Sequence, residues 1–148
     1  MPKERALQSV QISTIAHATD DLDKIQIALR FILPESLKMR EVFTRKYVQG
    51  HHGNPIVTFE AKLTKLQEVE EFIEYFAKQL PTSEKRLIRR NLGAHSDDEG
   101  NLYIRLDKQQ AFRGEIKLCN EDPIRVRLKF SRLSRKVAEL MKMFLESE

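Results

Sequence analysis

The sequence predicts an α+β fold, a single-domain two-layer sandwich with a mostly antiparallel sheet and helices on one face, in the order βαββααββα. Two patterns predict this class, because apolar and polar residues alternate in several segments while apolar residues recur at helical spacing between them. The length of 148 residues suits one hydrophobic core. We therefore expect residues 1–148 to form one domain.

The first half of the chain predicts a strand, a helix and a pair of strands, at residues 10–17, 22–33, 37–48 and 56–63. The first segment alternates between apolar and polar side chains, as a strand with one covered face does. Thr19 and two aspartates precede the helix as capping residues, and Pro34 ends it. β-Branched and aromatic residues predict the two later strands, which the turn-rich residues 49–55 connect.

The second half predicts two helices, two main strands with short pieces between them, and a last helix. In order, these are residues 64–80, 83–92, 102–107, 108–112, 115–118, 124–130 and a helix that begins near 131. Thr64 and Gln67 have the spacing of a capping box for the first of these helices. Gly93 is predicted to end the second helix in the left-handed conformation, and Gly114 to close the short helical turn. We expect the last helix to bury Phe144.

Positive charge is concentrated in one part of the chain. The net charge is +4, but residues 84–136 hold 14 cations against 8 acids, whereas residues 1–83 balance at zero and residues 137–148 carry −2. Such a concentration favours a polyanionic partner, although a solvated basic face remains the alternative.

A cationic row on one strand is the leading candidate for a binding surface. Arg125, Arg127 and Lys129 alternate with four apolar residues, so one face of this strand is apolar and the other cationic. We expect Arg105 and Tyr103 to share that face, with Phe43, Arg45 and Tyr47 as further candidates. Cations interleaved with aromatic rings suit RNA, because cations contact phosphate and rings stack on unpaired bases. The alternative is an exposed face that its charges keep from aggregating.

A second basic cluster falls on the helix predicted at 83–92. Arg86, Arg89 and Arg90, together with Lys85, are predicted to point outward, while Leu87, Ile88 and Leu92 point inward. Arg86 and Arg90 lie one helical turn apart, a spacing that suits adjacent phosphates or an acidic partner. A solvated helix face is the alternative.

The connection at residues 50–55 is the most unusual local sequence. His51 and His52 lie between glycines, with Asn54 close behind. Such histidines could meet a phosphate, transfer a proton or bind a metal. A metal would need a third ligand from elsewhere, such as His17, His95 or Cys119, and the spacing matches no known metal motif. We favour a hairpin loop and predict no metal and no cofactor.

The remaining patterns point away from an enzyme and from a membrane protein. The chain has no phosphate-binding loop, no dinucleotide glycine motif and no nucleophile elbow. Its one cysteine, Cys119, cannot form an internal disulfide, and the acids close to it make it a poor candidate for a nucleophile. No apolar run approaches the ~20 residues of a membrane span, and we expect a cytoplasmic protein.

Three segments together carry a family resemblance. They are Tyr-Val-Gln-Gly-His-His-Gly-Asn-Pro-Ile at 47–56, Arg-Asn-Leu at 90–92 and Leu-Asp-Lys-Gln-Gln-Ala-Phe at 106–112. The chain resembles, from its first strand to Phe130, the archaeal predicted RNA-binding proteins described as exosome subunits with a double-stranded-RNA-binding-domain-like fold. That family is similar in fold to the large-subunit ribosomal protein that binds 5S ribosomal RNA.

The resemblance implies an archaeal cytoplasmic protein that contacts structured or double-stranded RNA and associates with the RNA-processing exosome. Family-like positions include His51, His52, Asn54 and Lys108, which we add to the candidate RNA-binding residues. Two alternatives stay open. The open sheet face could instead meet another protein or a second copy of the chain, or the histidine loop could hold a small metal-dependent active site.

Overall fold

The computed structural model describes residues 7–50, 53–131 and 144–146. Five antiparallel strands form one sheet in the spatial order β2-β3-β1-β5-β4. Their bounds are Leu7–Ala16 for β1, Thr44–Gln49 for β2, Pro55–Leu63 for β3, Asn101–Leu106 for β4 and Ile124–Phe130 for β5. Two neighbouring strand pairs, β2-β3 and β4-β5, flank β1 at the centre. The predicted α+β class with an antiparallel sheet is confirmed.

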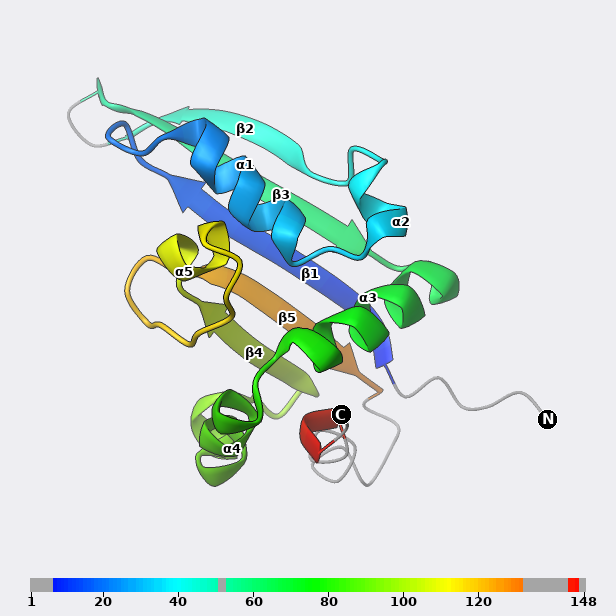
Figure 1. The fold of residues 1–148 in the computed structure, drawn as a ribbon. Helices are drawn as coiled ribbons and strands as arrows, with labels where there is room; N and C mark the ends of the chain where they lie inside the picture. The colour runs from blue at the N-terminus through cyan, green and yellow to red at the C-terminus, as the bar shows by residue number, and fades with distance from the viewer. Residues whose placement is uncertain (1–6, 51–52, 132–143, 147–148) are drawn as a thin grey trace.

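Helices cover one face of this sheet. Their bounds are Leu22–Phe31 for α1, Glu35–Lys38 for α2, Leu66–Gln79 for α3, Thr82–Arg90 for α4 and Lys108–Phe112 for α5, with a 3₁₀ turn η2 at Leu92–Ala94. Figure 1 shows α1, α3 and α5 lying against the same face, with α1 next to α5 and with α4 beyond β4. The opposite face of the sheet carries no helix within the described ranges.

The core lies between the sheet and this helix layer. Val126 and Leu128 of β5 and Ile12 of β1 are completely buried. Phe72 and Phe76 of α3 belong to the same buried cluster, and their stacked rings have centres 5.2 Å apart. The alternation read from the sequence is confirmed, because successive side chains of a strand point to opposite faces. The apolar side of each central strand therefore faces the core.

The prediction of a strand from residue 37 onward is wrong at its start. Residues 35–38 form the short helix α2, and β2 begins only at Thr44. Leu37 is 1% exposed, so this helical turn buries a leucine that a solvent-facing edge strand would leave outside. Pro34 occupies the N-cap position, where its missing N–H costs nothing.

Two helix ends also differ from the predictions. Lys65, rather than Thr64, is the N-cap of α3, and no side chain caps it. Gly93 lies in the 3₁₀ turn and is absent from the glycines with positive φ, so the predicted left-handed cap is wrong. Gly114 follows α5 with a φ of 84°, so the prediction that it closes this helical turn is confirmed.

The C-terminal helix is described only in part. Phe144 is buried, which confirms that prediction, and Leu145 is buried beside it. Residues 132–143, which carry the rest of the predicted helix, lie outside the described part of the chain. Among the described helices, none combines the length and apolar character that crossing a bilayer requires.

Candidate nucleic-acid interface

The cationic row of β5 lies on the sheet face opposite the helices. Arg125 is exposed, and Arg127 and Lys129 are half-buried, while the residues between them are buried in the core. The register of β4 places Arg105 opposite Arg125 and Tyr103 opposite Arg127. Cross-strand partners share a face and lie close together. These five residues, which the sequence predicted to group, therefore occupy one surface.

The central and edge strands extend this surface. Gln11 of β1 pairs with Arg127 on one side and with Lys62 of β3 on the other. Lys46 of β2 lies opposite Thr58 of β3, on the same face. Glu60 is the one acidic residue that the described strands place on the face opposite the helices. We call this surface the open sheet face, made up of Lys46, Glu60, Lys62, Tyr103, Arg105, Arg125, Arg127 and Lys129.

From the sequence we did not identify Lys46 and Lys62 as residues of this surface. The signal was present, because the buried odd-numbered positions of β3 leave its even-numbered positions, including Lys62, on the other face. The sequence does not show that β3 pairs with β1. In this pairing Gln11 of β1 lies between Lys62 of β3 and Arg127 of β5, so the two cations flank it on the same face.

The aromatic edge of the open sheet face is held by an acid. Tyr103 donates its hydroxyl to Asp97 Oδ2 at 2.8 Å, and the Arg105 guanidinium lies 5.7 Å from the Tyr103 ring centre. The Asp97 carboxylate also accepts the Asn101 amide and the backbone N–H groups of Asn101 and Glu99. Burial alone would raise the pKa of Asp97, but these hydrogen bonds lower it to about 2. The pKa of Tyr103 is raised, mainly because its hydroxyl donates a hydrogen bond to Asp97. Tyr103 is thereby fixed as a neutral phenol.

Two polar atoms beside this edge have no hydrogen-bond partner among the described residues. They are Arg127 Nε and Asn101 Oδ1, and both are buried. Buried polar atoms in proteins are nearly always hydrogen-bonded, because leaving one unpaired costs about 1–3 kcal/mol. The open sheet face therefore retains polar groups that the protein itself does not satisfy.

The basic cluster on α4 is divided by the structure. Arg86 and Arg90 are exposed, as predicted, whereas Arg89 donates to the Leu145 carbonyl at 3.0 Å and ties α4 to the C-terminal segment. Lys85 is only 4% exposed, so its predicted outward position is wrong. It lies one turn before the buried Ile88 and therefore shares the inward face of α4.

The inward prediction for Leu87 is wrong as well. This side chain is 50% exposed, since it lies about 100° around the helix from Ile88 and outside the buried face of α4. Figure 1 shows α4 at one end of the molecule, beyond β4, so its two exposed arginines do not lie on the sheet.

Lys108 lies in an internal ion-pair cluster. Its ammonium group is 2.8 Å from Asp122 Oδ2, 3.8 Å from Asp20 and 2.5 Å from the Ile15 carbonyl, and its side chain is 15% exposed. His17 Nε2 lies 3.2 Å from the other oxygen of Asp122. Burial raises the pKa of Asp122, but Lys108 and His17 outweigh that effect and lower it. The Lys108 charge is compensated within the protein.

The same cluster holds the one grouping of potential metal ligands found in the described part of the chain. Ligand atoms of His17, Asp20 and Asp122 lie within 4.8 Å of one another. The Lys108 ammonium already contacts both carboxylates, and a positive charge there opposes a metal cation. The grouping therefore favours an ion-pair network.

Residues 50–54 connect β2 to β3, and Gly50, Gly53 and Asn54 are described among them. The Gly50 N–H donates to the Asn54 carbonyl at 2.6 Å, and Gly53 has a φ of 77°. Asn54 is exposed. His51 and His52 lie outside the described residues.

Arg45 and Tyr47 do not join the open sheet face. They pair with Phe59 and Val57, whose side chains are buried beneath the helices, so both lie on the helix side of β2. The Arg45 guanidinium lies 5.2 Å from the Phe59 ring centre. Phe43 precedes β2 and lines a pocket on that same side. The expectation that these three residues join the cationic row is wrong, because the strand register assigns them to the other face.

A family model described as RNA binding matches residues 9–130, which include the whole sheet apart from the first residues of β1. The chain belongs to this RNA-binding family. The RNA-binding protein PAB1135 of Pyrococcus abyssi is 31% identical over 145 residues, covering 95% of this chain and 94% of that protein.

Solved structures show the same fold. Mth689, a DUF54 protein from Methanothermobacter thermautotrophicus, matches with a TM-score of 0.74 at 26% identity over 95% of this chain and 99% of its own. AF2318, a protein of the same DUF54 family model from Archaeglobus fulgidus, matches with a TM-score of 0.76 at 28% identity over 93% and 96%. These relatives are archaeal, and their single α+β domain agrees with the fold described above.

Proposed function

We propose that this protein is a non-catalytic RNA-binding protein and that its open sheet face contacts the backbone of structured, double-stranded RNA. The observation that carries the proposal is the charge of that face, on which six cations accompany Glu60 within the described strands. Basic side chains that neutralise phosphates release counterions and supply most of the affinity of such complexes. Membership of the RNA-binding family supports the same partner.

A duplex fits the shape and chemistry of this face better than an unpaired strand. Adjacent strands lie about 4.8 Å apart, so the five strands present a surface about 19 Å across. Single-strand readers stack bases on free aromatic rings. On the open sheet face that role would fall to Tyr103, whose hydroxyl is bound to Asp97 and whose ring lies beside Arg105. Phosphate contact, rather than base stacking, therefore dominates.

Reversing the charge of the β5 row tests the proposal. We expect Arg125→Glu, Arg127→Glu and Lys129→Glu together to weaken binding to an RNA hairpin at least a hundredfold in a gel shift at low salt. The control reverses three exposed cations of the helix layer. It combines the changes Lys24→Glu, Lys78→Glu and Arg113→Glu.

The control has the same net charge as the test variant, so it separates a surface effect from a general charge effect. Circular dichroism shows whether each variant folds, and if the first does not, triple glutamine variants at the same positions replace both the test and the control. Unchanged affinity in a folded β5 variant, or equal loss in the control, contradicts the assignment of this surface.

Arg86 and Arg90 of α4, and the hairpin turn around Asn54, are proposed as secondary contacts outside the sheet. Both groups are exposed at opposite ends of the molecule. Single alanine changes at these positions are expected to weaken hairpin binding only a few-fold, because each removes at most one phosphate contact.

Association with the archaeal exosome is proposed on the family resemblance alone. Size-exclusion chromatography of the protein mixed with purified exosome subunits, with and without RNA, tests whether the contact is direct.

Size-exclusion chromatography of the protein alone and with RNA tests the alternative that the open sheet face joins two copies of the chain. A stable dimer that RNA does not dissociate, and that the β5 variant abolishes, would favour that alternative.

A further inference from the structure

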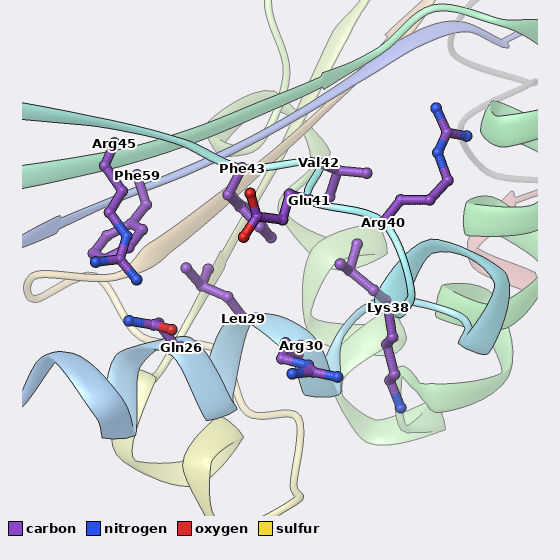
Figure 2. A pocket seen from close by; sticks show the side chains of 11 residues that line it. Gln26, Leu29, Arg30, Lys38, Arg40, Glu41, Val42, Phe43, Arg45 and Phe59 are labelled. Carbon is purple, nitrogen blue, oxygen red and sulfur yellow. The ribbon is translucent and has the colours of Figure 1, made fainter.

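A pocket of about 360 Å³ lies on the helix side of the sheet. It is bounded by α1, by the segment that joins α2 to β2, and by strands β2 and β3 (Figure 2). Its volume falls within the range of small-molecule sites, which runs from about 300 to 1,000 Å³.

The floor of the pocket is apolar and partly aromatic. Leu29, Leu33 and Phe59 are buried, and Phe43 and Val42 are half-buried against them. Figure 2 shows Leu29 of α1 and Phe43 converging from opposite sides of the cavity. Such a floor suits a flat, weakly polar ring.

The rim is basic, with two kinds of cation. Lys38 lies 3.6 Å from Glu35, and Arg40 is paired with Glu68, so their charges are compensated. Arg30 and Arg45 make no ion pair among the described residues. These two guanidinium groups remain available to a ligand anion, and a planar guanidinium suits the oxygens of a phosphate.

Two further side chains supply neutral and acidic hydrogen-bonding groups. Gln26 of α1 and Arg45 of β2 face one another across the mouth, and the Glu41 carboxylate lies beside Phe43 (Figure 2). An amide both donates and accepts hydrogen bonds, while a carboxylate accepts them from ring N–H and amino groups. Nucleobases carry both donors and acceptors on their edges.

We propose that this pocket holds a single nucleotide, with its base on the Phe43 floor and its phosphate paired with Arg45. Gln26 and Glu41 contact the edge of the base. The Arg45 guanidinium lies 5.2 Å from the Phe59 ring centre, so this cation already contacts the aromatic floor of the pocket.

The position of the pocket connects it with the open sheet face. β2 is an edge strand, and its neighbouring residues Arg45 and Lys46 lie on opposite faces of the sheet. An unpaired nucleotide of a bound RNA could therefore pass around this edge and enter the pocket. This link rests on the proposed function, whereas the pocket can also take a free nucleoside monophosphate.

Two arms of one experiment distinguish these sources. The first titrates GMP, AMP, CMP and UMP separately into the protein in a calorimeter. The second compares a fully paired RNA hairpin with the same hairpin carrying one bulged nucleotide. We expect wild-type protein to prefer the bulged hairpin about tenfold, the worth of one stacked base.

Arg45→Ala is the test variant, and Arg113→Ala, at an exposed arginine that is the C-cap of α5, is its matched control. We expect Arg45→Ala to abolish the bulge preference and mononucleotide binding, with less than a twofold effect on the paired hairpin. Glu41→Gln serves as a second variant if Arg45→Ala does not fold.

The outcomes separate the two proposals. Mononucleotide binding without a bulge preference supports the site and identifies free nucleotides as its source. Mononucleotide binding without any hairpin binding overturns the proposed function and leaves the pocket assignment standing. A bulge preference that survives in Arg45→Ala, or the absence of both mononucleotide binding and bulge preference, overturns the pocket assignment.

Discussion

The open sheet face and the Lys108 cluster are both rich in charge, but their charges are balanced in different ways. On the open sheet face, basic residues of four strands share one surface, with Glu60 as the acid among them in the described strands. In the Lys108 cluster, one ammonium group contacts two carboxylates and a backbone carbonyl.

This difference shows that the number of cations in a segment does not identify a binding surface. Lys108 and the β5 row belong to the same basic segment of the sequence, yet the protein satisfies Lys108 internally. A cation that already has close acidic partners gains little from a phosphate, because it must first give up those contacts. The uncompensated cations are the ones that a polyanion can use.

Among the changes that test this comparison, we expect the largest effect when Lys108 is replaced, and we expect it on the stability of the folded protein. Lys108→Met keeps most of the side-chain stem and removes the ammonium group, so Asp122 Oδ2 and the Ile15 carbonyl each lose a hydrogen bond, while Asp122 Oδ1 keeps its contact with His17. We expect the free energy of unfolding, measured by urea denaturation, to fall by about 2 kcal/mol.

RNA affinity in Lys108→Met is expected to change less than twofold. A double variant with Asp122→Asn measures the coupling between the two groups. A large loss of RNA affinity with unchanged stability would make Lys108 a contact residue and would remove the contrast between the two regions.

A smaller effect is expected from one cation of the open sheet face. Lys62→Ala removes the charge that lies across Gln11 from Arg127 on the open sheet face. We expect the slope of log affinity against log salt to decrease by about one, because one fewer counterion is released. Fluorescence anisotropy with a labelled hairpin over a range of salt concentrations measures this slope.

Lys78→Ala is the matched control for Lys62→Ala. Lys78 is exposed on α3, within the helix layer, and pairs with Glu74. Its removal is expected to leave the salt slope unchanged. Equal slopes in the two variants would mean that RNA does not distinguish the faces of the sheet.

The smallest expected effect concerns acid stability at the edge of the open sheet face. The pKa of Asp97 is about 2 in the folded protein, below its ordinary value of 3.8. A lowered carboxyl pKa stabilises the folded state above pH 4, and this contribution is lost as the pH falls from about 4 to 2. Because Asp97 is exposed to solvent, we expect the contribution to be at most about 1 kcal/mol.

Urea denaturation of wild type and Asp97→Asn between pH 2 and 7 measures this contribution. The difference in unfolding free energy between the two proteins is expected to shrink as the pH falls below about 4. A difference that stays constant down to pH 2 would show that the Asp97 charge does not hold Tyr103 in place.

Much of the fold was accessible from local patterns. The alternation in β5 identified its buried and cationic faces, and the apolar spacing in α3 identified its buried stripe. The errors fell where local signals compete with packing. Lys85 is a charged residue that α4 buries beside Ile88, and α2 forms where β-branched residues nearby favoured a strand.

The sequence by itself determined which side chains of each strand share a face, because the side-chain period of a strand is two residues wherever the strand lies. Only the tertiary structure decided which strands are neighbours. That order brought Lys62 into line with Arg127, moved Arg45 and Tyr47 to the helix side, and placed Asp122 against Lys108. Whether a charge is compensated depends on distances of a few ångströms between residues far apart in the chain, and local patterns carry no information about those distances.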